Sequence, residues 1–213
     1  LVQFVMMVIG SAGQGAVIDT GADRQAVVAP RTFQMVTLGE ASARIAGGSR
    51  VAAYAELANA MREASEFAAG RWQGDGNLLT RADAQALAAV VTGAQPLYVQ
   101  VERAADVRAV LGLRKQYSKL RLVLLGVSEG WLVADELAAS GVPVLADPLD
   151  NLPASFEQLG ASHSNVGRMV RAGVKVGLGG LSGGTTGPRI APQYAGNLVA
   201  LSRVPGATGL SRG

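Results

Sequence analysis

The chain has 213 residues, of which 49% are hydrophobic, 16% charged and 5% aromatic, and its formal net charge is +3. This length and apolar content suffice for one well-buried core and exclude a disordered chain. The sequence contains no cysteine, which excludes disulfides, zinc–thiolate sites and cysteine nucleophiles within it.

The first 48 residues have an irregular pattern. Residues 1–9 form an apolar run that predicts a buried strand, and a glycine-rich stretch follows at 10–15. Short strand-like pieces lie at 25–28 and 33–37, and no clear helix accompanies them. We therefore expect an irregular excursion over about residues 10–48.

Residues 49–70 predict a strongly amphipathic helix. Ser49 is its expected cap, Gly70 its end, and Arg62 and Glu66 an i,i+4 ion pair. Helical spacing places one apolar face inward. The residues expected on that face are Val51, Tyr54, Leu57, Ala58, Met61, Ala64, Phe67 and Ala68.

From residue 80 onward, helix and strand signals alternate regularly. Apolar residues at helical spacing predict helices over 80–91, 104–117, 131–140 and 165–172. Val166, Met169 and Val170 are expected to point inward from the last of these, with Ser164 or Asn165 as its cap. Continuous apolar runs predict strands covered on both faces over 97–101, 121–126, 142–146 and 174–178.

Repeated βα units allow two folds, a doubly wound sheet or a (β/α)₈ barrel. About five or six units are visible, whereas a complete barrel needs about 250 residues. We expect an α/β fold of the TIM-barrel type, incomplete in this chain, with residues 1–213 forming a single partial barrel domain.

Two glycine-rich stretches are candidates for ligand loops. Residues 10–15 have the spacing G-x-x-G-x-G instead of G-x-G-x-x-G, and no helix pattern or Lys-Ser/Thr pair follows. A structural turn is therefore favoured over dinucleotide binding. The hypothesis of a nucleotide-dependent oxidoreductase rests on this stretch alone. Residues 177–187 follow a strand, and they are open to two interpretations, a pocket loop or a disordered connection.

Polar side chains follow three of the predicted strands, at the end where barrel active sites are built. The pocket candidates are Gln100, Glu102, Arg103, Glu129 and Asp147. Glu102 is open to three roles: general base, ligand, or ion-pair partner of Arg103. Asp147 and Asp150 are divided between a pocket and a turn, since Asp before Pro commonly starts turns.

Other residue types argue against several classes of protein. His163 is the one histidine of the sequence and lies in a polar stretch, so a solvated loop residue is favoured and a Ser–His–Asp relay is not. The densest basic stretch, Arg114 to Arg121, is interpreted as a solvated helix end, so we expect no nucleic-acid partner. No apolar run reaches the roughly 20 residues that span a bilayer, so we expect a soluble protein, cytoplasmic or periplasmic.

An ordered series of segments resembles the amidohydrolase superfamily, in the branch that includes imidazolonepropionase-like proteins. The segments that carry the resemblance are PLYVQVERAADV at 96–107, GVSEGWLVADEL at 126–137, GVPVLADPL at 141–149, GVKVGL at 173–178 and AGNLVA at 195–200. The resemblance implies a (β/α)₈ barrel beside a small β-sandwich, with the first strands, the sandwich and the C-terminus outside this chain. It also implies hydrolysis of amide or cyclic imide C–N bonds with divalent metal, normally zinc.

The family's metal ligands do not carry over to these positions. One ligand histidine falls within Val99–Glu102, the next on or beside Gly126, and the aspartate near Leu181, while the His-x-His strand would precede residue 1. Gln100 and Glu102 are suited to a hard cation but do not restore a zinc site of nitrogen donors. The resemblance therefore implies a metal site whose usual ligands are lost in this chain.

Two hypotheses for function follow. The first is an amidohydrolase-like hydrolase of C–N bonds, with a degenerate metal site and a small-molecule or peptide-like amide substrate. The alternative is a non-catalytic barrel that acts as a structural or regulatory partner subunit or binds a small ligand. In either case we expect a homo- or hetero-oligomer.

Overall fold

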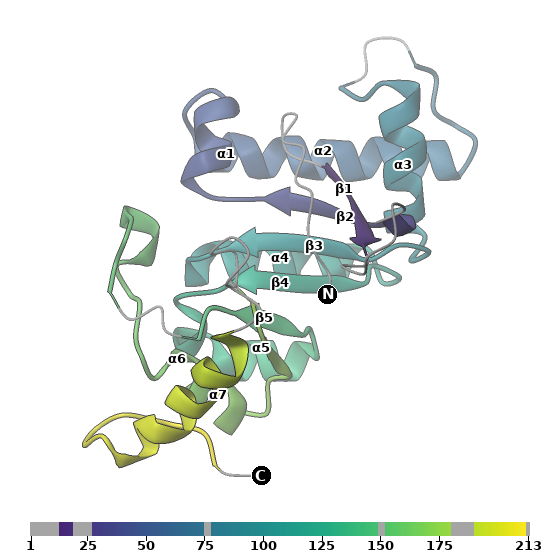
Figure 1. Cartoon of the computed structure of the whole chain (residues 1–213). Coiled ribbons are helices and arrows are strands. Elements are labelled where there is room, and N and C mark those ends of the chain that lie inside the picture. The colour runs from purple at the N-terminus through teal and green to yellow at the C-terminus, as the bar shows by residue number, and fades with distance from the viewer. Residues whose placement is uncertain (1–12, 19–26, 75–77, 149–151, 180–189, 212–213) are drawn as a thin grey trace. The chain divides into compact units, whose positions relative to one another are not determined.

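The computed structural model describes residues 13–18, 27–74, 78–148, 152–179 and 190–211 (Figure 1). The predicted strand at 1–9, Asp150, Leu181 and residues 180–187 of the second glycine stretch lie outside these ranges. The described strands form one six-stranded sheet in chain order, β1-β2-β3-β4-β5-β6. The sheet is mostly parallel, so the α/β class is confirmed, while closure into a barrel stays a prediction.

The strands are β1 Gly13–Ile18, β2 Val27–Thr37, β3 Leu97–Val101, β4 Leu122–Gly126, β5 Val144–Ala146 and β6 Val176–Leu178. The α-helices are α1 Glu40–Ile45, α2 Arg50–Ala68, α3 Arg81–Val91, α4 Ala104–Gln116, α5 Ala134–Ser140, α6 Asn165–Arg171 and α7 Ala191–Ala200. Short 3₁₀ segments include η1 Gly130–Leu132, η2 Phe156–Gln158 and η4 Leu201–Arg203. None of the helices in the described ranges is long and apolar enough to cross a membrane.

The chain divides into two compact units. Unit 1 consists of Leu1–Val99 and Gly112–Leu122, and unit 2 of Gln100–Leu111 and Val123–Gly213. The predicted single domain over 1–213 stays a prediction.

The ribbon β1–β2 occupies the region expected to be an irregular excursion. The two strands pair antiparallel from Gly13↔Met35 to Ile18↔Val27, and α1 follows β2. Gly13–Gly15 therefore lie in a strand, where a turn had been favoured. The Phe33 ring lies over Gly15, so that a Cβ at residue 15 would overlap it. Glycine thus makes room for an aromatic side chain of the partner strand.

Helix α2 confirms most of the predicted amphipathic pattern. Leu57 is 3% exposed and Met61 fully buried, Ser49 Oγ accepts the Ala52 N–H at 3.4 Å, and Arg62 Nη1 lies 2.7 Å from Glu66 Oε1. The inward placements of Val51 and Ala68 are wrong, because Val51 is 78% exposed and Ala68 is exposed as well. Buried positions begin at Ala53, and two residues correspond to about 200° of rotation around a helix.

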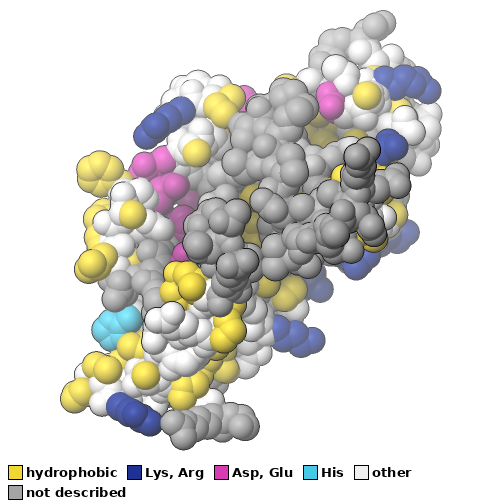
Figure 2. Space-filling model, viewed as in Figure 1, with side chains coloured by type: hydrophobic (Ala, Val, Ile, Leu, Met, Phe, Trp, Pro, Cys, Tyr) yellow, Lys and Arg dark blue, Asp and Glu magenta, His cyan; other side chains and the backbone are white. Residues whose placement is uncertain are grey.

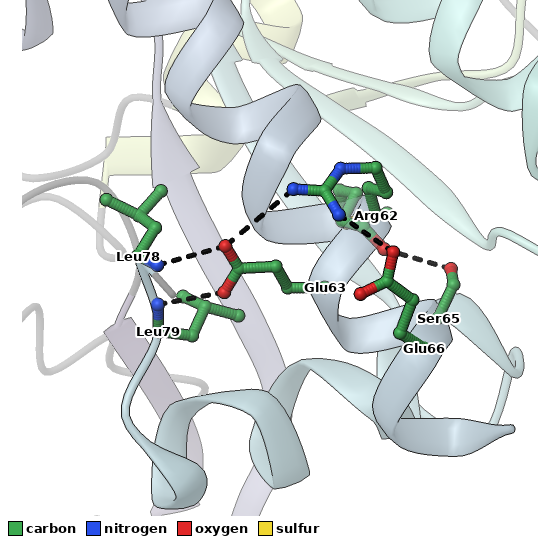
Figure 3. Close-up of polar contacts among 7 residues, drawn as sticks. Arg62, Glu63, Ser65, Glu66, Leu78 and Leu79 are labelled. Atoms are coloured by element: carbon green, nitrogen blue, oxygen red, sulfur yellow. Dashed lines mark hydrogen bonds and ion pairs between the residues drawn. The ribbon is translucent and has the colours of Figure 1, made fainter. Parts of the chain in front are cut away.

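A carboxylate inside unit 1 ties α2 to the segment before α3 (Figure 3). Glu63 is 3% exposed, and its Oε1 and Oε2 accept the backbone N–H groups of Leu78 and Leu79 at 2.9 and 3.0 Å. Helix α3 then begins at Thr80, whose Oγ1 accepts the Asp83 N–H at 3.2 Å. The predicted start of this helix near residue 80 is therefore confirmed, with Thr80 as its N-cap.

Strands β4, β5 and β6 of unit 2 are parallel, with Leu124 opposite Val144 and Leu145 opposite Gly177. Their burial differs from the prediction of strands covered on both faces. Val144 and Ala146 are fully buried, whereas Leu145 between them is half-buried. One face of these strands is packed more tightly than the other.

The predicted helix over 131–140 is interrupted. Residues 130–132 form η1, Val133 has φ −128°, and α5 begins only at Ala134. The inward placement of Val170 is also wrong, since its side chain is 41% exposed, whereas the buried positions of Val166 and Met169 are confirmed. Gly141 is the C-cap of α5, with a left-handed φ of 66° that suits glycine.

Candidate functional site

The carboxyl ends of β3, β4 and β5 lie at one edge of the sheet. Just beyond β3, the Val101 carbonyl accepts the Val127 N–H at 2.7 Å, and the Glu102 carbonyl accepts the Glu129 N–H at 3.0 Å. At the end of β4, Gly126 is opposite Ala146, the last residue of β5. The residues that follow these three strands are therefore neighbours, as expected for parallel βα units.

The segment Gly126–Glu129, here named the β4 turn, has an unusual backbone. Gly126 has φ 79° and Val127 has φ 59°. Glycine adopts such angles freely, but a β-branched residue at positive φ costs about 1–3 kcal/mol. The Val127 side chain is nevertheless fully buried. Its surroundings therefore hold a strained conformation in place.

Glu102 contributes to holding the β4 turn. Its Oε2 accepts the Ser128 backbone N–H at 3.1 Å and the Ser128 hydroxyl at 2.5 Å. Arg103, next in the chain, donates from Nη2 to the Phe156 carbonyl at 2.6 Å, and its buried Nε has no hydrogen-bond partner among the described residues. The described contacts thus direct these two adjacent charged groups to different parts of unit 2.

Glu129 caps a helix. Its Oε2 accepts the N–H of Ala104, the first residue of α4, at 2.9 Å. A carboxylate there satisfies an otherwise free amide and complements the positive end of the helix dipole. The side chain also packs over Gly160, where an added Cβ would lie 2.8 Å from Glu129 Cγ.

The other two pocket candidates are Gln100 and Asp147. Gln100 is half-buried on β3, between the fully buried Val99 and Val101. Asp147 is half-buried and directly follows β5. The structure therefore brings Glu102, Glu129 and the β4 turn together, and it places Asp147 at the same edge through the β4–β5 register.

Two residues of this region were missed by sequence reasoning. Asn165 is 3% exposed, and its amide bridges two segments, because Oδ1 accepts the Trp131 N–H at 2.8 Å and Nδ2 donates to the Val127 carbonyl at 2.9 Å. The sequence suggested only a helix cap for it. Ser128 is 2% exposed and carried no signal beyond its place after a strand.

A cleft with a volume of about 570 Å³ opens elsewhere on unit 2, between η1–α5 and α6. Its walls include Trp131, Arg168 and Arg171, and the Arg168 guanidinium carbon lies 4.7 Å from the centre of the Trp131 ring. The Trp131 Nε1 donates to the Gly160 carbonyl at 2.8 Å, which fixes the indole. None of the five strand-end candidates lines this cleft.

The described residues do not fit a zinc centre. They contain no group of three or more His, Cys, Asp or Glu side chains placed to hold a metal ion. His163 is exposed, as predicted, and appears in cyan on the surface in Figure 2. The carboxylates of Glu102 and Glu129 already accept backbone N–H groups, and the described residues named at this edge include no histidine, the nitrogen donor that zinc prefers.

Comparison with known proteins gives two similarities. The chain is 35% identical over 69 residues to amidohydrolase tasK of Hapsidospora irregularis, a match that covers 29% of this chain and 7% of tasK. Its structure resembles the crystal structure of an amidohydrolase from Thermotoga maritima MSB8, with a TM-score of 0.74 and 17% identity. This second match covers 87% of this chain and 51% of the Thermotoga chain.

The chain thus spans about half of the Thermotoga protein and a small part of tasK. No protein-family model matches it. The structural match shows the fold, and the sequence match comes from a second protein that is also named as an amidohydrolase.

Proposed function

We propose that the chain is an amidohydrolase-superfamily protein of the imidazolonepropionase-like branch that hydrolyses C–N bonds in amides or cyclic imides. The observation that carries the proposal is the fold, which matches an amidohydrolase over 87% of this chain. The local identity to tasK and the ordered segments at 96–107, 126–137, 141–149, 173–178 and 195–200 support it independently.

The reaction site of this proposal lies at the carboxyl ends of β3, β4 and β5. Parallel βα folds place their chemistry at that end because the loops there converge. Asp147 is proposed as the acid–base group because it is a half-buried carboxylate that directly follows β5 at this edge of the sheet. Gln100 is the favoured residue for binding a substrate amide, because its carboxamide both donates and accepts hydrogen bonds.

We further propose that the metal site is degenerate in this chain. Gly126 itself offers no side chain to a metal, and the carboxylates of Glu102 and Glu129 accept main-chain N–H groups. The proposal therefore assigns no step of the reaction to a metal held by the described residues.

Purified full-length protein tests the hydrolase proposal through a panel of amides and cyclic imides, with metal content measured by elemental analysis. We expect turnover that survives chelation. Asp147→Asn should lower kcat by roughly 100-fold or more, as removal of a general acid–base does. Asp135→Asn is the matched control, because Asp135 is an exposed carboxylate that lines the cleft beside Trp131, away from the strand ends. No turnover on any substrate would reject the hydrolase, and stoichiometric metal would reject the degenerate site.

The second candidate function is a non-catalytic barrel, a structural or regulatory partner subunit or a small-ligand-binding protein. The observation that favours it is the structural use of Glu102 and Glu129, two carboxylates that an enzyme would otherwise offer to substrate. Size-exclusion chromatography with light scattering, before and after mixing with an active homologue, tests the subunit version. A chain that remains alone and hydrolyses the panel would exclude it.

A further inference from the structure

The end of β4 contains a space that one residue leaves empty and another fills. Gly126 has no side chain, and a Cβ built there would lie 2.8 Å from Glu102 Cδ and closer still to Oε1. Its φ of 79° is a second obstacle to any side chain, because L-residues rarely adopt that conformation. Residue 126 is therefore closed both by its own backbone and by a neighbouring carboxylate.

The carboxylate of Glu102 is anchored and does not simply rest against the glycine. It accepts both the N–H and the O–H of Ser128, at 3.1 and 2.5 Å. Ser128 is 2% exposed, so water has little access to take over these bonds. The carbonyl of Glu102 meanwhile accepts the Glu129 N–H, so residue 102 binds the β4 turn through both its main chain and its side chain.

We propose that Glu102 is a positioning residue: its carboxylate fills the space over Gly126, holds the β4 turn through Ser128, and closes the end of β4 to a metal-ligating side chain. This role is independent of turnover, and it is one that the sequence did not suggest for Glu102. It also gives a physical reason why the described residues do not fit a zinc centre.

A double-mutant cycle between Glu102→Ala and Gly126→Ala tests whether the two residues share one space. Removing the carboxylate relieves the overlap at residue 126, so the cost of Gly126→Ala should be smaller in the Glu102→Ala background. The effect of the double variant on the unfolding equilibrium constant should differ from the product of the two single effects by roughly threefold or more.

Gly141→Ala is the matched control for this cycle. Gly141 has φ 66°, close to that of Gly126, but nothing lies within 4 Å of an added Cβ. Its substitution therefore reports the backbone cost alone and should combine with Glu102→Ala as a simple product. If Gly126→Ala also combines as a simple product, the shared-space proposal is overturned.

Hydrogen exchange of single amides distinguishes positioning from general stabilisation. Glu102→Ala should speed exchange of the Ser128 amide roughly tenfold, while the Ala104 amide, held by Glu129, changes little. Glu129→Ala should have the reciprocal effect. Glu102→Gln should restore most of the Ser128 protection, because the amide oxygen still accepts. Equal loss at both amides in Glu102→Ala would mean that Glu102 only stabilises the fold.

Ser128→Ala keeps the test valid if Glu102→Ala does not fold. This variant removes the hydroxyl that holds the Glu102 carboxylate but leaves the N–H of residue 128. The carboxylate should then be less firmly held over residue 126, so the effects of Ser128→Ala and Gly126→Ala on the unfolding equilibrium constant should come close to multiplying.

The closure to metal is tested by titrating the wild-type chain with Mn²⁺ alone and following amide line widths. We expect no selective broadening at residues 126–129, and saturable broadening centred on Ser128 would overturn the closure.

Discussion

Glu63 in unit 1 and Glu102 in unit 2 each direct a carboxylate at a backbone amide. Glu63 accepts two consecutive amides, Leu78 and Leu79, and ties a helix to an approaching loop. Glu102 accepts the amide and the hydroxyl of one residue, Ser128, in a turn with positive φ angles. The first fixes where a segment lies, whereas the second fixes its conformation. Both contacts show that a carboxylate taken out of water can serve to hold the backbone.

Among the variants that test this comparison, Glu63→Ala should lower the free energy of unfolding the most. The substitution removes a 3% exposed acceptor of two amides and should lower the free energy of unfolding by about 2 kcal/mol. Urea unfolding monitored by circular dichroism measures the change. Glu63→Gln, which retains one acceptor oxygen, should recover part of the loss, and a loss below that of Glu66→Ala would contradict the anchoring role.

Glu129→Ala should have a smaller effect because it removes a single cap. The Ala104 amide loses its acceptor, and the free energy of unfolding should fall by about 1 kcal/mol. Thr80→Ala removes an equivalent cap from α3 and is the matched control in unit 1. Similar midpoint shifts in urea would confirm the capping role of Glu129, and a much larger shift would indicate that its packing over Gly160 dominates.

Glu66→Ala breaks an exposed ion pair next to Glu63. The pair joins Arg62 and Glu66 one helical turn apart at 2.7 Å, with the Arg62 side chain 55% exposed. Its loss should lower the free energy of unfolding by about 0.3–0.5 kcal/mol. Because salt screens exposed charges, the difference between the two chains should shrink at about 1 M salt. A difference that persists there would contradict this origin.

Tyr117 gives the smallest expected effect and only at high pH. Burial raises its pKa above the usual 10.0, against the lowering effects of the Ser65 hydrogen bond and the Arg62 charge. The unfolded chain therefore loses the phenolic proton first. The contribution of Tyr117 to the free energy of unfolding is fully present below pH 10. It should decline as the pH rises from 10.0 through the higher folded pKa. Tyr117→Phe should remove this part of the decline, as thermal melts at pH 9 and 11 would show.

The sequence predicts the βα units of unit 2 well because their local signals agree with one another. Apolar runs, helical spacing and the C-cap at Gly141 all coincide with observed elements. The β1–β2 ribbon was harder to predict, because its pairing joins Gly13 to Met35, which are distant in the sequence. In addition, Gly15 is needed there only to make room for the Phe33 ring of the partner strand. Glycine in such a strand resembles glycine in a turn until the partner strand is known.

The sequence placed Glu102 and Glu129 at the ends of parallel strands, and the structure brings them together, because parallel strands have their carboxyl ends at the same edge. Their part in a functional site stays a prediction. Their partners depend on a left-handed turn at Val127, a conformation that no β-branched residue signals in advance. The bridging role of Asn165 likewise depends on tertiary contacts, since its place in the sequence equally suits a helix cap.

The empty position at Gly126 has a consequence for how this protein can change over generations. A side chain at residue 126 meets both an unfavourable backbone angle and the Glu102 carboxylate, whereas loss of that carboxylate leaves only the backbone angle. The two substitutions are therefore epistatic, and the path that alters residue 102 first is the easier one. Relatives that carry a side chain at the position of Gly126 should accordingly have lost the glutamate at the position of Glu102.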